Sequence, residues 1–162
     1  MATGNRSASS RRPIRAVPGW EACTTETGAR ARALRTLSPE ECLDLLEPGG
    51  IGRVGFTSAG RIMMLPVNFA VTLRTIIFRT APDTLLARHA DAPVSFEADY
   101  VDDARHEGWS VLVHGHAQQV TDERAVLRLE DQLDFEPWAP GARDVYVRIM
   151  PAQITGRRIE PS

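Results

Sequence analysis

The sequence contains no lysine, and all 19 of its basic residues are arginine, so a site that needs a cation must use arginine or histidine. Only two cysteines occur, Cys23 in an expected tail and Cys42 in an expected helix, which argues against a disulfide framework and favours a reducing, cytoplasmic compartment. No apolar run approaches the roughly 20 residues of a membrane-spanning helix. Glycine-rich phosphate loops, Cys-x-x-Cys pairs and a Ser-His-Asp spacing are also missing, so no motif of this kind identifies a catalytic residue.

Charge is distributed unevenly along the 162 residues. Residues 1–36 carry seven arginines and two glutamates, whereas residues 37–162 carry 12 arginines and 19 acidic residues. The first segment has no apolar period and many Gly, Ser, Pro and Thr residues, which predicts a disordered, arginine-rich tail. A basic tail on an acidic body is also typical of proteins that bind nucleic acid or an anionic surface. Because Trp20 is the only aromatic residue in the segment, we do not expect nucleic acid as a partner. The lack of a long apolar run likewise predicts no membrane partner.

Residues 37–162 alternate between short helical and strand patterns, and we assign them to one domain. Helices are expected between Ser38 and Pro48, over 84–90 after a capping Asp83, and from Thr121-Asp122 to Leu133. Strands are expected at 51–57, 61–71, 75–80, 94–100 and 109–120, and in two last segments, 145–150 and 154–159, that Pro151 interrupts. Short connections favour antiparallel pairing, and five or six such strands with few helices predict a small closed barrel.

The expected strand 61–71 is apolar on both faces, with Met63 on one side and Met64 on the other. Such a strand needs cover on both sides, which a barrel interior and a subunit contact would provide. Pro66 cannot donate to a strand ladder and therefore predicts a gap or a bulge at its position.

The strand-turn-helix pattern from Ile76 to His89 is the best candidate for a ligand site. It places Arg79 and Thr80 at a strand end and Thr84 in the first turn of a helix, where free backbone N–H groups and the helix dipole favour a phosphate. An ordinary strand-to-helix turn with a capping Asp83 has the same pattern, and because such turns are common, the residues by themselves favour that interpretation. His114 and His116 share a strand face, but no third ligand is evident, and we expect no metal site.

Several motifs, in order and spacing, resemble those of the pyridoxamine 5'-phosphate oxidase-like FMN-binding split-barrel family. They are Leu65-Pro66-Val67-Asn68-Phe69, Phe78-Arg79-Thr80-Ala81-Pro82, the runs 92–97 and 108–117, and the final segments 147–151 and 154–159. The resemblance spans about Leu37 to Ile159. It implies a mainly β, α+β fold: a six-stranded antiparallel split β-barrel with a few flanking helices, over residues 37–162.

The resemblance also implies a homodimer with two FMN molecules at the subunit interface. Residues matching Leu65 to Asn68 would lie against the flavin ring, those matching Arg79 and Thr80 would reach the ribityl and phosphate, and Trp109 and Ser110 would approach from a neighbouring strand. The candidate cofactor-binding residues are Leu65, Pro66, Val67, Asn68, Phe78, Arg79, Thr80, Thr84, Arg88, Trp109 and Ser110.

The sequence departs from the family pattern just after Thr84. Leu85 and Leu86 stand where relatives have a cation for the phosphate, and Asp83 stands where many have glycine. Because a carboxylate repels a phosphate, FMN would bind more weakly or another ligand, such as a deazaflavin, would be preferred. Arg88 is four residues after Thr84 on the same helix face, and we hypothesise that it replaces the missing cation.

The function expected from the resemblance is an FMN-dependent oxidoreductase that acts on a small organic substrate or a nicotinamide donor. No side chain stands out as a catalytic acid or base. The alternatives are a non-enzymatic barrel that binds a flavin, deazaflavin or haem, a member that has lost its cofactor, and a basic-tailed interaction protein.

Overall fold

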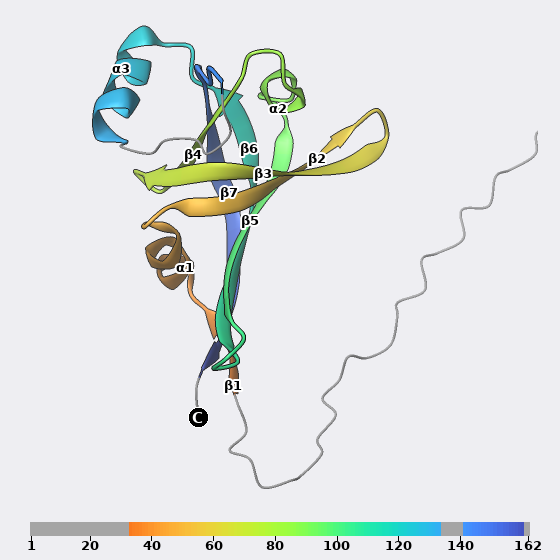
Figure 1. The fold of residues 1–162 in the computed structure, drawn as a ribbon, viewed down its shortest axis with the longest axis vertical. Helices are drawn as coiled ribbons and strands as arrows, with labels where there is room; N and C mark the ends of the chain where they lie inside the picture. The colour runs from red at the N-terminus through yellow and green to blue at the C-terminus, as the bar shows by residue number, and fades with distance from the viewer. Residues whose placement is uncertain (1–32, 134–140, 161–162) are drawn as a thin grey trace, which may run out of the picture. The chain divides into compact units, whose positions relative to one another are not determined.

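The computed structural model describes residues 33–133 and 141–160, all of which belong to one compact unit (Figure 1). They form seven strands: β1 (Ala33–Leu37), β2 (Gly50–Ser58), β3 (Arg61–Thr72), β4 (Thr75–Thr80), β5 (Pro93–Asp102), β6 (Glu107–Gln119) and β7 (Val145–Glu160). They also form three helices: α1 (Pro39–Leu46), α2 (Leu85–Arg88) and α3 (Glu123–Gln132). Among these residues no helix is long and apolar enough to span a bilayer.

The strands pair antiparallel in the order β1-β7-β4-β3-β2-β5-β6, and a further β6–β7 pairing closes the six strands β2 to β7 into a ring. Strand β7 makes this closure possible because it is 16 residues long. One end of β7 pairs with β4 and the other end with β1, while β6 pairs along most of its length. The predicted mainly β fold, a six-stranded antiparallel split barrel with flanking helices, is therefore confirmed.

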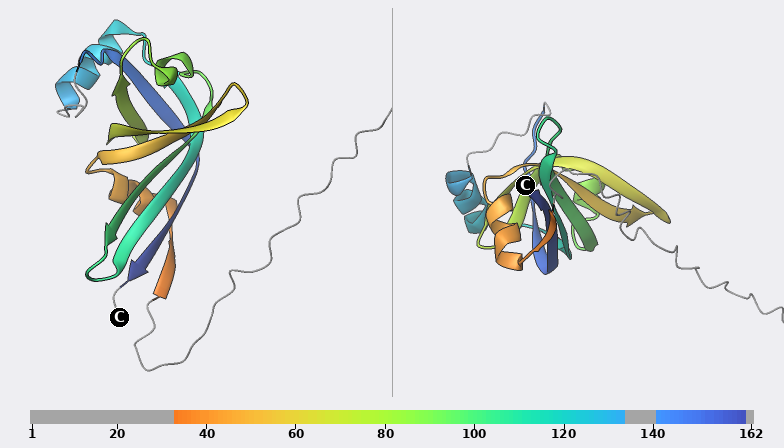
Figure 2. Two further views of the ribbon diagram at one scale, coloured as in Figure 1. Left: turned by 45° about the vertical axis from the view of Figure 1, so that its right-hand side comes forward. Right: turned by 90° about the horizontal axis from the view of Figure 1, so that it is seen from below.

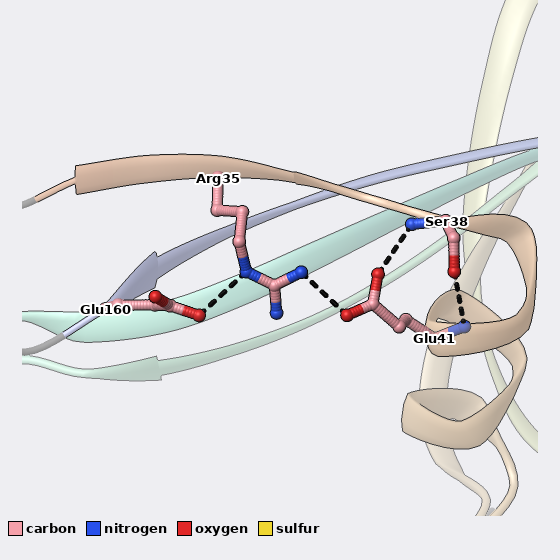
Figure 3. Close-up of polar contacts among 4 residues, drawn as sticks. All are labelled: Arg35, Ser38, Glu41 and Glu160. Carbon is pink, nitrogen blue, oxygen red and sulfur yellow. Dashed lines mark hydrogen bonds and ion pairs between the residues drawn. The ribbon is translucent and has the colours of Figure 1, made fainter.

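Strand β1 was not expected, because the composition of residues 1–36 predicted a tail. The structure places residues 33–36 in the sheet, while the rest of that predicted tail lies outside the described residues. The Arg35 guanidinium donates from Nε to Glu160 at 2.8 Å and from Nη1 to Glu41 at 2.6 Å (Figure 3). This arginine therefore links β1 to both α1 and β7, and Leu37, at the end of β1, is buried.

The helix caps follow the sequence pattern in two of three cases. Ser38 caps α1 in a reciprocal capping box with Glu41, and Asp122 caps α3 through the Ala125 N–H. The predicted cap of α2 was wrong. Thr84, not Asp83, is its N-cap, because the Thr84 hydroxyl rather than the Asp83 carboxylate accepts from the Ala87 N–H.

Of the two proline expectations, one needs a correction. Pro151 does not interrupt the last strand, because the β6–β7 register shifts there: Gly115 pairs with Pro151 and His114 with Gln153, so Ala152 has no cross-strand partner. This bulge accommodates the missing N–H of the proline. The gap or bulge expected at Pro66 is present as a gap: the β2–β3 register runs through Pro66 without a break, but no β4 residue pairs with β3 at that position.

The barrel interior is filled by apolar side chains, of which Phe78 and Phe96 are the largest fully buried ones. The inner face of β3 contributes Val67 and Phe69 to this core, as expected. Its outer face is exposed in the single chain, where Ile62 is 85% and Met64 is 61% exposed. The β2–β3 hairpin that carries these residues projects from the ring (Figures 1 and 2). The expected subunit contact on this face stays a prediction.

Candidate functional site

Five of the predicted cofactor-binding residues line one small cavity of about 100 Å³. They come from the middle of β3 and the end of β4, and the full lining is Pro66, Val67, Asn68, Arg79, Thr80, Leu86 and Arg143. The antiparallel β3–β4 register places Phe69 opposite Phe78. This register therefore brings the two sequence motifs to one place.

A chain of two hydroxyl groups lies beside this cavity. Thr84 Oγ1 donates to the Ala81 carbonyl at 2.9 Å, accepts from the Ala87 N–H at 3.2 Å and lies 2.7 Å from Thr80 Oγ1. Because a hydroxyl has one proton, the Thr80 hydroxyl must be the donor to Thr84. In this arrangement Thr84 has no proton to offer a phosphate. Thr80, which is 1% exposed, presents only lone pairs to a ligand and suits a hydroxyl donor.

Arg79 is held in place by three contacts at the end of β4. Its Nε donates to the Arg143 carbonyl at 2.9 Å, its Nη2 lies 3.9 Å from an Asp144 carboxylate oxygen, and its guanidinium carbon lies 5.1 Å from the Tyr146 ring centre. Guanidinium groups over aromatic faces are attracted by the ring quadrupole. Burial raises the pKa of the Tyr146 phenol, and the nearby Arg79 cation opposes this shift in part. The Tyr146 phenol therefore stays neutral. The three contacts together hold the Arg79 guanidinium in one direction.

The other candidates near this cavity have different surroundings. Phe78 is 1% exposed and belongs to the barrel core, and Leu65 packs against the same core. Arg88 is exposed and does not line the cavity, and Asp83 is exposed as well. Helix α2 has only four residues, so the helix-dipole argument for a phosphate at its start has little support.

Trp109 and Ser110 lie elsewhere in the chain, in a cavity of about 410 Å³ near the β5–β6 hairpin. This second cavity is also lined by Leu34, Tyr100 and Arg157, and it shares no residue with the first. A single chain thus does not bring Trp109 and Ser110 to the residues of the 65–68 and 78–80 motifs.

Arg143 and Leu86 are the two lining residues outside the predicted set, and Arg143 is the polar one. It precedes β7 in a segment without apolar period, so no local pattern marks it. Only the β4–β7 register, which pairs Arg79 with Tyr146, brings Arg143 beside the end of β4. A hydrogen bond from Arg79 to the Arg143 carbonyl, between residues 64 apart in sequence, holds it there.

The donor set of the small cavity fits part of a flavin nucleotide. Two arginines and an asparagine can donate to an anionic group, and the Thr80 oxygen can accept from a polyol hydroxyl. At about 100 Å³ the cavity is smaller than the roughly 300 Å³ or more of a complete ligand pocket, so it has room for only a portion of the molecule. Among the described residues no group of three or more His, Cys, Asp or Glu could hold a metal ion.

Comparison with known proteins relates this chain to one family. The model of the family described as pyridoxamine 5'-phosphate oxidase matches residues 38–158. The uncharacterized protein Rv0080 of Mycobacterium tuberculosis is 39% identical over 135 residues, covering 80% of this chain and 88% of that protein. The structure of the FAD binding protein from Mycobacterium smegmatis has 37% identity and a TM-score of 0.62, covering 79% of this chain and all of that one (100%). A structure from Corynebacterium glutamicum has 33% identity and a TM-score of 0.69, covering 83% and 98%.

Proposed function

The chain belongs to the pyridoxamine 5'-phosphate oxidase family, and from this premise we propose that it binds a flavin nucleotide and acts as an oxidoreductase. The observation that carries the proposal is the meeting of Pro66, Val67, Asn68, Arg79 and Thr80 in one cavity whose polar groups suit an anion and a polyol. When bound, the flavin would supply hydride or electron transfer between a nicotinamide donor and a small organic substrate.

The residues of the chain would bind and orient the cofactor. The arginine side of the cavity would hold its anionic end, and the buried Thr80 oxygen would accept from a ribityl hydroxyl. The β3 segment Leu65 to Asn68 would run along the ring. Because residues 61–69 of β3 pair with β2 and Phe69 packs edge-on against Phe96 at 4.9 Å, this segment is a rigid support.

We also propose that the functional unit is a homodimer. The small cavity encloses only part of a flavin, while Ile62 and Met64 leave an apolar surface on the outer face of the same strand, β3. A second copy would cover this face and bring its own Trp109 and Ser110 toward the ring. The two separate cavities of the single chain would then be the two halves of one site.

Among flavins, FMN is our first choice, on the resemblance of the motifs. The similar Mycobacterium smegmatis protein is an FAD binding protein, so FAD is the direct competitor, and a deazaflavin is the third candidate. Spectra and chromatography of the extracted cofactor distinguish the three. FMN and FAD in the oxidised state absorb near ~450 nm, and a deazaflavin absorbs at shorter wavelength.

The test is titration of the purified protein with FMN, FAD and a deazaflavin, followed by fluorescence and by the mass of the complex in solution. We expect one flavin per chain and a dimeric complex. Asn68→Ala should weaken flavin binding, whereas Ser58→Ala, at the far end of the same hairpin, should not. Anaerobic bleaching by NADH or NADPH would support the oxidoreductase. Binding without bleaching by any donor would favour a non-enzymatic flavin carrier, and no uptake of any flavin would refute the proposal.

A further inference from the structure

A cavity of about 530 Å³, called here the outer-face cavity, adjoins Ile62 and Met64 on the outer face of the β2–β3 hairpin (Figure 2). Residues of β5, β6 and β7 complete its lining. The lining is mainly apolar, and its polar side chains are Thr57, Ser95 and His114. No carboxylate or guanidinium group lines it among the described residues. This size, with mainly apolar walls and a few polar groups, is typical of a site for a small organic ligand.

Ser95 and His114 are the polar anchor of the outer-face cavity. They are direct cross-strand partners on β5 and β6, and Ser95 Oγ lies 2.9 Å from His114 Nδ1. The part of the chain that the structure describes offers the Ser95 hydroxyl no other acceptor, so its proton satisfies Nδ1 and the neutral ring carries its own proton on Nε2. In the charged ring both nitrogens carry a proton. His114 Nε2 is therefore a hydrogen-bond donor in both states.

The bulge between β6 and β7 lies at the wall of the same cavity. The register shifts between His114 and Gly115, and Ala152, which has no cross-strand partner, lines the cavity. A Cβ atom at Gly115 would collide with the Met150 carbonyl oxygen, so the close approach of the two strands here requires glycine. Bulges are frequent beside functional sites, where they redirect a side chain, and this bulge directly follows His114.

The outer-face cavity and the small cavity are neighbours along β3. Met64 lines the outer-face cavity and Pro66 lines the small cavity. Residues two apart in a strand lie on the same face, and at roughly 3.3 Å per residue these two are separated by about 7 Å. A flavin ring placed along Leu65 to Asn68 would therefore adjoin the outer-face cavity.

We propose that the outer-face cavity binds the small organic substrate of the oxidoreductase, and that His114 Nε2 donates to a carbonyl or carboxylate oxygen of this substrate. The apolar walls hold its hydrocarbon body, and Ser95 is a positioning residue that fixes the tautomer and direction of the imidazole. The inference rests on the proposed function and deepens it by naming the substrate class: apolar ketones, aldehydes or carboxylates. The second copy proposed above would cover the open side of the cavity.

The test uses three probes with the same aromatic body: acetophenone carries a neutral acceptor, benzoate an anionic acceptor and benzylamine a cationic donor. They are titrated into the full chain, and nitrogen NMR follows its four histidine rings. The signals of His114 are identified by their loss in His114→Phe. We expect the two acceptors to shift these signals and benzylamine to leave them unchanged. A larger effect of acetophenone identifies ketones and aldehydes as the substrates, and a larger effect of benzoate identifies carboxylates.

His114→Phe keeps an aromatic ring and removes the donor. Measured from the proton signals of the probe, it should weaken acetophenone binding roughly twofold to tenfold, the range of one neutral hydrogen bond. Ser95→Ala should shift the His114 nitrogen signals before any probe is added, which a merely structural serine would not do, and should weaken binding less. His116→Phe is the matched control, because His116 is exposed on the same strand and lines no part of the cavity. It should leave binding unchanged.

The proposal is overturned if no probe shifts the His114 signals, if benzylamine binds as well as the acceptors, or if His116→Phe costs as much as His114→Phe. Signals of His114 that change with protein concentration but with no probe would show that a second copy fills the cavity, and would overturn it too.

The link to the flavin is tested separately. In the flavin-loaded protein the bound probe should perturb the absorption of the flavin, because the two sites adjoin along β3. An unperturbed spectrum would refute the substrate assignment while leaving the proposed function intact. A chain that binds the probes at His114 but takes up no flavin would instead refute the proposed function, and with it the role of this cavity as a substrate pocket.

Discussion

Replacing Gly52 by alanine should destabilise the barrel, although the backbone permits it. Gly52 lies in extended β2, and a Cβ atom there would be 2.3 Å from Phe96 Cζ and 2.9 Å from the Glu97 carbonyl oxygen. Neither neighbour can withdraw easily: Phe96 is fully buried against Phe69, and the carbonyl belongs to β5, which pairs with β2. The substitution therefore forces a core side chain and a strand to move together.

The expected magnitude is the difference between two effects. Overpacking of a filled core costs about 1–3 kcal/mol, whereas the lower backbone entropy of unfolded alanine returns about 0.4–1 kcal/mol. A net loss of about 1–2 kcal/mol in the free energy of unfolding follows, with a fall in Tm of several degrees. Because Phe69 adjoins Asn68, displacement of Phe96 should also weaken ligand binding at the small cavity.

Urea unfolding at a fixed protein concentration, followed by tryptophan fluorescence, measures the loss. Gly55→Ala is the matched control in the same strand, because its Cβ would meet nothing closer than 3.7 Å. Gly52→Ala combined with Phe96→Leu should be less unstable than the sum of the single variants, since the smaller side chain relieves the contact. A Gly52→Ala protein as stable as Gly55→Ala would refute the steric argument.

Two further predictions concern the edge of the fold and one of its turns. The Ser38 backbone N–H and the Arg35 cation lower the pKa of Glu41 from its ordinary value of 4.5, so its contribution to stability should be present above pH 4.5 and lost as the pH falls through the lowered pKa. Thermal unfolding of Glu41→Gln and wild type should accordingly differ at pH 7, and the difference should shrink as the pH falls below 4.5; a difference independent of pH would contradict this. Leu73 and Arg74 both have positive φ, 49° and 62°, in the β3–β4 turn, where the side chains add strain. Replacing them by Asn-Gly should stabilise the protein by about 1–2 kcal/mol in urea unfolding, and no gain would show that the turn is relaxed.

Local sequence patterns were sufficient to predict much of the fold of this protein. The Ser38-Pro39-Glu40-Glu41 start of α1, the alternation along β5 and the mainly β, antiparallel character of the domain were all predicted, because capping and periodicity depend on neighbours within a few residues. The order of the motifs was sufficient to predict the family as well.

Tertiary structure decided what the local patterns could not. Two local features could be assigned only from the folded structure. The N-cap of α2 is Thr84 rather than the predicted Asp83. Strand β7 continues through Pro151 because a bulge in its pairing with β6 accommodates the N–H that proline lacks. The bulge is fixed by the β6–β7 register, and the cap by which side chain reaches the Ala87 N–H in the folded turn.

The candidate site shows the same division. The sequence by itself indicated that the 65–68 and 78–80 motifs belong together, through their resemblance to a family. Only the β4–β7 pairing added Arg143, which no local signal marks, and only the folded chain separated Trp109 and Ser110 from that cavity. Residues far apart in sequence meet through strand register and ring closure, and these are set by the free energy of the whole core rather than by any one segment.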